Sequence, residues 1–442
     1  MKLRDLGGAV AAVSLGNYAA VGVGVFTAVT LARILGAAEY GRYALLLMVV
    51  QVALALGTSW SLTALVRFGA REHALTGTLG TALAARAAVA VPAMVVLLAI
   101  LWLGRTPLAA YLGVAEGALI AVAVQLIGSA LAQTFAGTLQ AAGRMALYGA
   151  SLLAERVVTL AAILALAALA PFDAVLAIWA GAAGAGVSAL ASLGVAWRAG
   201  LLRDLRLDRE VLGGYWRFSL PQLGGGWAGI FGSQWIDYVI IRAFLTLDDL
   251  GVYALAFQIA GAVQQLAVVL ATVLLPRVSA MAARGEHVAV RAFLGRVVPG
   301  WLAAYGALCA IGIVAAGPLV PALFGARFAG AVAPLSILLV AAAVAAIFHT
   351  LHPVLAAYAI VWPVTAGVVA GVAANVILDL VLIPTLGVTG SALATLGANA
   401  VSALAVMAVA QARLGAATAR YALCILAPAG AAVAMAFLRV AR

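Results

Sequence analysis

Charged residues are scarce in this 442-residue sequence, in which only 9% of the residues are Asp, Glu, Lys or Arg and 67% are hydrophobic. A soluble globular protein has about 25% charged residues. The hydrophobic residues also occur in runs of about twenty, the length of a helix that crosses a bilayer. These features exclude a soluble, disordered, coiled-coil or nucleic-acid-binding protein. They predict an integral membrane protein with many spanning helices, surrounded by membrane lipids.

Lysine and cysteine are almost absent. Lys2 is the only lysine, so the chain cannot build the Gly-Lys-Ser/Thr loop of an ATPase, a pyridoxal Schiff base or a protein-kinase site. Cys309 and Cys424 both lie in hydrophobic runs, where a buried thiol is expected rather than a disulfide. His349 and His352 are three residues apart but lack the neighbouring acid of a zinc-protease motif. We therefore expect no cofactor and no metal site.

Twelve hydrophobic runs are long enough to cross a membrane, and a thirteenth is shorter. The twelve cover residues 10–32, 43–66, 79–103, 114–139, 147–169, 174–197, 218–241, 252–275, 293–316, 329–351, 360–383 and 388–410, and the thirteenth covers 421–438. Most basic residues of the connecting segments fall on the side of the N-terminus. Because basic residues accumulate on the cytoplasmic side, the N-terminus and the long loop after the sixth run are predicted to be cytoplasmic.

The sequence also repeats itself. Residues 41–45 (GRYAL) resemble residues 251–255 (GVYAL), and VSALA occurs at both 187–191 and 401–405. The chain therefore divides into two six-helix halves, residues 1–205 and 206–415, with 416–442 as an additional hydrophobic segment. An even number of spans leaves both halves in the same orientation, and parallel repeats of this kind place the substrate between them. The predicted fold is an all-α polytopic membrane protein with two parallel repeats around a central cleft.

Some polar residues fall inside predicted spans, where a charge costs at least ~2.5 kcal/mol. Arg156 lies deep in the fifth span and Arg86 lies nearer an end of the third. Either guanidinium matches the oxygens of a phosphate. Glu155 shares a polar stripe with Ser151 and Thr159, which faces either water or a neighbouring helix. The candidates for a substrate cavity are Asn17, Arg86, Glu155, Arg156, Gln222, Gln234, Asp237, Arg242, Gln258 and Gln264.

Two acids in the second half are candidates for binding a coupling ion. Asp237 lies near the outer end of the seventh span, where it can pair with Arg242, bind an ion or satisfy a helix end. The glycines at 224–226 weaken this span, which makes it a candidate gating helix. Asp379 lies one turn after Asn375 in the eleventh span. It is either a protonation site or a residue that packs helices together.

Several segments resemble the polysaccharide transport family of the multidrug/oligosaccharidyl-lipid/polysaccharide flippase superfamily. They are Ala32-Arg33, Leu35-Gly36, residues 40–43 (YGRY), Gly251-Val252-Tyr253, Leu323-Phe324-Gly325, residues 375–379 (NVILD), Ile383-Pro384, Gly387 and residues 390–395 (GSALAT). The resemblance implies a flippase of the bacterial inner membrane, which moves an undecaprenyl-pyrophosphate-linked oligosaccharide to the periplasmic leaflet by alternating access. The product would serve O-antigen (lipopolysaccharide), capsule or exopolysaccharide assembly. The candidate partners are H⁺ or Na⁺ and a polysaccharide polymerase.

Two other functions of the same superfamily stay open. One is cation-coupled export of a drug or metabolite, although the first span lacks the membrane acid that drug exporters commonly use. The other is lipid II flipping, for which fourteen firm spans would be expected. An enzyme is not expected, because no catalytic acid or histidine stands at a span end beside a sizeable loop.

Overall fold

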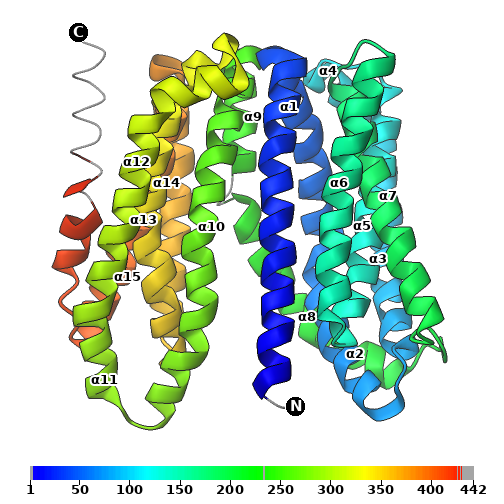
Figure 1. Ribbon diagram of the computed structural model, residues 1–442, viewed down its shortest axis with the longest axis horizontal. Coiled ribbons are helices and arrows are strands. Elements are labelled where there is room, and N and C mark those ends of the chain that lie inside the picture. Colours follow the sequence, from blue (N-terminus) through cyan, green and yellow to red (C-terminus); the bar gives the residue numbers. More distant parts are fainter. Residues whose placement is uncertain (1–2, 232–233, 426, 429, 431–442) are drawn as a thin grey trace. The chain divides into compact units, whose positions relative to one another are not determined.

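The structure is a computed structural model that describes residues 3–231, 234–425, 427, 428 and 430. This described part of the chain is helical and contains no strand (Figure 1). The elements are α1 (Leu3–Gly57), η1 (Ser59–Ser61), α2 (Leu62–Thr76), α3 (Gly80–Leu103), α4 (Arg105–Leu112), α5 (Ala118–Ala141), α6 (Met145–Leu169), α7 (Ala174–Arg198), α8 (Arg209–Phe231), α9 (Gln234–Phe244), α10 (Leu247–Ala283), α11 (His287–Ala292), η2 (Phe293–Val297), α12 (Val298–Phe324), η3 (Ala326–Ala331), α13 (Val332–Ala357), α14 (Trp362–Leu386) and α15 (Val388–Leu414). Residues 419–425 form a further short helical segment.

Ten stretches of the described residues are long and apolar enough to cross a membrane. The first two predicted spans are joined in α1, whose 55 residues are kinked at Gly36 (φ 70°, ψ 177°). At ~1.5 Å per residue this helix exceeds twice the ~30 Å thickness of the hydrocarbon layer. The described residues of the seventh predicted span belong to α8 and α9, and residues 232 and 233 lie outside the described residues. The all-helical membrane fold is thus confirmed, whereas the count of twelve spans stays a prediction. Of the thirteenth run, residues 426, 429 and 431–438 lie outside the described residues.

The chain separates into two compact units. Unit 1 comprises Met1–Leu35 and Arg42–Phe231, and unit 2 comprises Gly36–Gly41 and Gly232–Arg442. In unit 1, α5 packs against α2 and α7, and α7 packs against α6; in unit 2, α13 packs against α10 and α15, and α15 packs against α14. Each unit thus has a helix, α5 or α13, that packs between two others, which agrees with the two repeats that the sequence predicts. The predicted boundary at 205/206 follows the sequence repeat and stays a prediction.

Six residues of the first helix complete unit 2. The first of them, Gly36, is the site of the kink, and a Cβ atom at Gly41 would overlap the carbonyl of Leu247 at the start of α10. The Tyr40 hydroxyl donates a 2.6 Å hydrogen bond to Oε1 of Gln258. The absence of a side chain at Gly41, and equally at Gly251, therefore allows two backbones to touch. This contact explains why the sequence repeats a glycine at these two positions.

Candidate functional site

Two acids from different helices meet inside unit 2. Asp237 comes from α9 and Asp379 from α14, and their carboxyl groups interact directly. Asp237 is 2% exposed and Asp379 is fully buried. The Tyr253 hydroxyl of α10 donates a 2.6 Å hydrogen bond to Oδ2 of Asp237, and the Thr395 hydroxyl of α15 lies 3.4 Å from the same oxygen. Four helices thus contribute to a single carboxyl pair.

The turn between α14 and α15 sets the depth of two of these groups. Gly387 connects the helices directly with φ 60° and ψ −142°, a conformation that a side chain disfavours. Asp379 and Thr395 each lie eight residues from Gly387, so an antiparallel hairpin brings them to the same level. A Cβ atom at Gly371 would overlap the Ser402 hydroxyl. Glycine at that position therefore lets the two helices pack closely.

Three of the four oxygens of the carboxyl pair lack a completed hydrogen bond within the described part of the chain. Oδ1 of Asp237 and both carboxyl oxygens of Asp379 are buried, and no donor among the described residues completes a hydrogen bond to them. Ser391, whose buried hydroxyl also has no completed hydrogen bond, lies beside Asp379. Two adjacent buried carboxylates repel each other strongly, so such a pair shares a proton or binds a cation. Oxygen atoms of this kind are the ligands that hard cations prefer.

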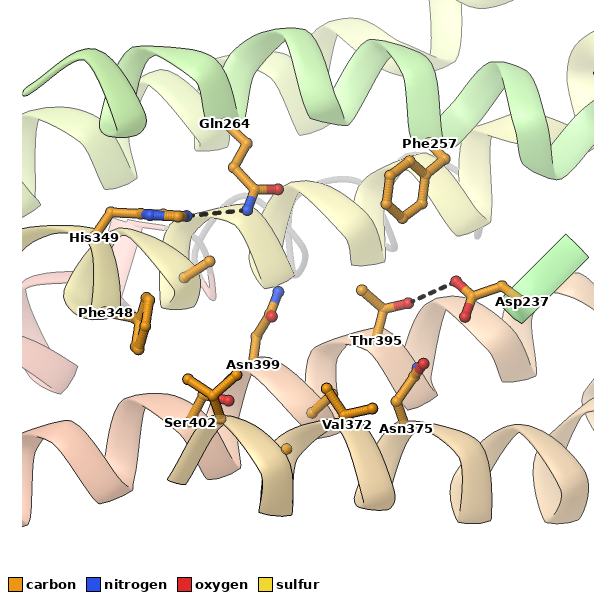
Figure 2. Close-up of a pocket in the computed structure, with 14 residues that line it drawn as sticks. Asp237, Phe257, Gln264, Phe348, His349, Val372, Asn375, Thr395, Asn399 and Ser402 are labelled. Atoms are coloured by element: carbon orange, nitrogen blue, oxygen red, sulfur yellow. Dashed lines mark hydrogen bonds between the residues drawn. The ribbon is translucent and has the colours of Figure 1, made fainter. Parts of the chain in front are cut away.

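A cavity of about 210 Å³ adjoins the pair inside unit 2 (Figure 2). It is lined by residues of α9, α10, α13, α14 and α15, and half of its lining residues are polar. The lining residues are Asp237, Phe257, Gln264, Ala345, Phe348, His349, Val368, Gly371, Val372, Asn375, Thr395, Ala398, Asn399 and Ser402. A polar cavity of this size holds several water molecules.

Unit 1 contains a buried cation. Arg86 of α3 is 1% exposed, and its Nη1 donates to the Thr58 carbonyl oxygen and the Ser61 hydroxyl. Its other nitrogens point to the Thr134 hydroxyl at 3.4 and 3.5 Å. The Tyr215 hydroxyl donates to the Ser61 carbonyl at 2.6 Å. These contacts lie where α1 ends and α2 begins, so Arg86 stabilises that break. We interpret it as a positioning residue, and its role in a substrate cavity stays a prediction.

Replacing Arg86 with Ala should destabilise the protein. The Thr58 carbonyl and the Ser61 hydroxyl would lose a donor, and each unsatisfied buried polar group costs about 1–3 kcal/mol. We expect a lower melting temperature in detergent and a lower yield of monodisperse protein. The matched control is Arg156→Ala, which removes an exposed guanidinium and should melt as the wild type does. A stable Arg86→Ala variant with defective transport would instead assign Arg86 to the substrate.

Arg156 has the opposite environment. It lies in the middle of α6, a helix that is only 6% buried over its most apolar stretch, and it is itself exposed. The phenol of Tyr43 lies close enough to Arg156 for an electrostatic interaction. Glu155 is half-buried, and its backbone carbonyl accepts a hydrogen bond from Thr159. A charge in mid-span is costly unless it meets water or a polar partner. The role of Arg156 in a substrate cavity stays a prediction.

The other predicted cavity residues are dispersed. Gln222 bonds to the backbone carbonyl of Phe218 in its own helix, and Gln258 accepts from Tyr40. Gln234 and Arg242 lie on α9 with Asp237. The side chain of Asn17 lies outside the described residues. Of the predicted set, only Asp237 and Gln264 line the cavity.

Sequence reasoning did not select Tyr253, Ser391 or Thr395 as site residues. A signal for all three was available, because they lie in the two segments that carry the family resemblance, 251–253 and 390–395. The sequence alone does not show that these two segments face Asp237 and Asp379.

Fold and site together define a multi-pass helical membrane protein built from two repeats, with a polar cavity in one of them. The family model described as "Polysaccharide biosynthesis protein" matches residues 7–282, well over half of the chain. The chain therefore belongs to this family, which confirms the family resemblance seen in the sequence.

Solved structures show the same fold. The lipid II flippase MurJ, in an inward closed conformation, superposes with a TM-score of 0.75 at 13% identity over 96% of this chain and 91% of that chain. A multidrug resistance MATE family transporter of the MOP superfamily, in an inward-facing conformation, gives a TM-score of 0.67 at 17% identity over 91% and 94%. The Vibrio cholerae MATE transporter VcmN, in its bent form, gives 0.56 at 15% identity over 95% and 99%. No curated protein sequence matches the chain significantly.

Proposed function

We propose that this protein is a flippase that moves an undecaprenyl-pyrophosphate-linked oligosaccharide from the cytoplasmic to the periplasmic leaflet of the bacterial inner membrane. It works by alternating access, with its N-terminus in the cytoplasm, and supplies a polymerase that builds O-antigen, capsule or exopolysaccharide. The family membership supports a role in polysaccharide assembly. The single observation that carries the energetic part is the buried carboxyl pair of Asp237 and Asp379, three of whose oxygens have no donor among the described residues.

The head group of such a substrate is the problem that the protein must solve. A pyrophosphate and several sugars cannot cross hydrocarbon unaided, because polar groups there lose their hydrogen bonds to water. Arg156, exposed in mid-span, offers a guanidinium fork that matches phosphate oxygens. The prenyl tail remains in the lipid while the head crosses. The reaction is transport, so no covalent bond of the substrate changes.

The carboxyl pair couples this movement to a cation gradient. Binding of H⁺ or Na⁺ neutralises the repulsion between Asp237 and Asp379, and therefore favours whichever conformation holds the two acids together. Each positive charge that crosses the membrane contributes ~2.3 kcal/mol per 100 mV. That energy biases the direction in which an otherwise reversible carrier moves its lipid.

The test is a flipping assay with the purified protein in proteoliposomes. Fluorescent undecaprenyl-pyrophosphate-linked oligosaccharide is incorporated, and a membrane-impermeant reductant reports which leaflet it occupies. We expect protein-dependent flipping that a Na⁺ or proton gradient accelerates. Lipid II and a small cationic dye are offered in parallel vesicles. Transport of lipid II alone would favour a lipid II flippase, transport of the dye alone would favour an exporter, and no protein-dependent transport of the oligosaccharide would refute the proposal.

A further inference from the structure

One end of the cavity is lined by a contact between two helices. Nε2 of His349 on α13 and Nε2 of Gln264 on α10 lie 3.3 Å apart, in hydrogen-bonding contact. Figure 2 shows this pair at one end of the cavity and Asp237 with Thr395 at the other. Among the described lining residues, only Asp237 and His349 have ionisable side chains. The cavity therefore extends from the carboxyl pair to a polar contact nearer the C-terminal end of α13.

Polar groups continue along the cavity between its two ends. Asn375 lies one helical turn before Asp379 on α14, and Asn399 and Ser402 lie on successive turns after Thr395 on α15. Nδ2 of Asn399 donates to the Ala341 carbonyl oxygen at 3.2 Å, which leaves its own carbonyl oxygen as an acceptor. Cations cross a protein where oxygen ligands and water replace their hydration shell, because an unsolvated charge is far too costly.

We propose that this cavity is the path by which the coupling cation moves between the carboxyl pair and the side of unit 2 where α13 ends, with the His349–Gln264 contact as its gate. The inference rests on the cation coupling proposed above. On the predicted topology that side is cytoplasmic. The cation moves through several waters held by the two asparagines and Ser402. Separation of His349 from Gln264 opens the path, and their hydrogen bond closes it.

The neighbouring histidine, His352, does not take part in the contact between His349 and Gln264. His352 is exposed and stacks on Phe348, with ring centroids 5.2 Å apart and planes 12° apart. It does not line the cavity. His352 is therefore a matched control for His349, since both are histidines one turn apart on the same helix.

Thiol labelling tests the path without reference to the lipid substrate. The background is the full chain without its two native cysteines (Cys309→Ala and Cys424→Ala), reconstituted in vesicles. Ser402→Cys places a thiol in the cavity, and Leu404→Cys places one on the outer surface of the same helix, where the native leucine is 63% exposed. Only a hydrated thiol ionises and attacks 2-aminoethyl methanethiosulfonate, which forms a mixed disulfide and releases methanesulfinate. We expect the Ser402→Cys protein to react, because its thiol lies in a hydrated cavity. The Leu404→Cys protein should be nearly inert, because its thiol lies on the outer surface of a predicted span, where lipid and not water surrounds it.

Opening the gate should accelerate this labelling. Loss of one hydrogen bond raises the open fraction roughly fivefold, so His349→Ala and Gln264→Ala should each increase the labelling rate of Ser402→Cys by about that factor. His352→Ala should leave the rate unchanged. Melting temperature and elution profile identify any variant that is misfolded, and the milder His349→Gln variant, which keeps a polar partner for Gln264, should label at the wild-type rate.

Three results would overturn the inference. The first is equal labelling of Ser402→Cys and Leu404→Cys, and the second is a rate that neither His349→Ala nor Gln264→Ala changes. The third is protection of Ser402→Cys by the oligosaccharide lipid but not by Na⁺ or acid, which would make the cavity a sugar site. Flipping that responds to neither ion gradient would instead refute the coupling proposed above, whatever the labelling rates, so the two failures are distinguishable.

Discussion

Asp379→Asn should abolish gradient-driven transport and leave the protein folded. The native carboxyl group is fully buried and has no donor among the described residues. An amide of the same shape brings its own N–H to Asp237, so the folded state loses nothing by the exchange. What disappears is the second negative charge, and with it the reason to bind a cation. We expect flipping to fall to the rate seen without a gradient, as measured in the proteoliposome assay.

A binding measurement separates this effect from a general defect. A cation that binds only the folded protein raises its melting temperature in proportion to the logarithm of its concentration. Na⁺, or acid if H⁺ is the coupling ion, should stabilise the wild type but not Asp379→Asn or Asp237→Asn. Asp248→Asn is the control, since Asp248 is an exposed acid in the first turn of α10. Normal gradient-driven flipping by Asp379→Asn would exclude the carboxyl pair as the coupling site.

Arg156→Ala should eliminate surface polysaccharide in cells while the protein remains in the membrane. Charge-assisted hydrogen bonds to an anion contribute about 1.5–3 kcal/mol each, so losing even one of them slows the passage of the head group by about ten- to 150-fold. Gel analysis of surface polysaccharide, with an immunoblot of the membrane fraction, measures both quantities. Arg156→Lys keeps the charge but not the fork and should retain part of the polymer.

The control for this prediction comes from the same helix. Arg144 caps the start of α6 and is exposed outside the predicted span. Arg144→Ala removes a guanidinium without removing one from mid-span, so it should leave surface polysaccharide unchanged. Full polymer in the Arg156→Ala strain would show that Arg156 does not contact the substrate.

The sequence predicts the fold well because membrane helices are specified by length and hydrophobicity alone. The repeat at 41–45 and 251–255 is equally clear in the sequence, and the structure brings Gly41 and Gly251 to the same backbone contact. Interruptions of helices are harder to predict from the sequence. The break at Thr58 to Ser61 lies inside an otherwise apolar run, and it depends on Arg86, which donates to it from another helix.

The candidate site was only half predictable. Asp237 and Asp379 each stand out as acids in hydrophobic runs, and each was selected for that reason. Their contact was not predictable, because a sequence fixes the depth of a residue in the membrane but not which neighbour its helix turns toward. His349 shows the same limit, since the sequence spacing of His349 and His352 does not reveal that His349 lines the cavity.

The repeats have diverged in charge. At the spacing that relates Gly41 to Gly251, Tyr43 corresponds to Tyr253, but Asp237 corresponds to Thr27. Unit 1 therefore keeps the tyrosine without the acid that Tyr253 contacts, and instead has Arg86 and Arg156 within its spans. On the proposed function, one repeat handles the anionic substrate and the other handles the cation.

The assignment of Gly36–Gly41 to unit 2 has a consequence for how the chain is made. These six residues leave the ribosome about two hundred residues before Gly251 and Gln258, against which they pack. During synthesis their glycine surface and the Tyr40 hydroxyl are therefore made before the residues of α10 that they contact. Unit 2 cannot be completed by its own contiguous sequence, because residues 36–41 belong to the first helix and pack against α10. The maturation of unit 2 is therefore not independent of the first helix.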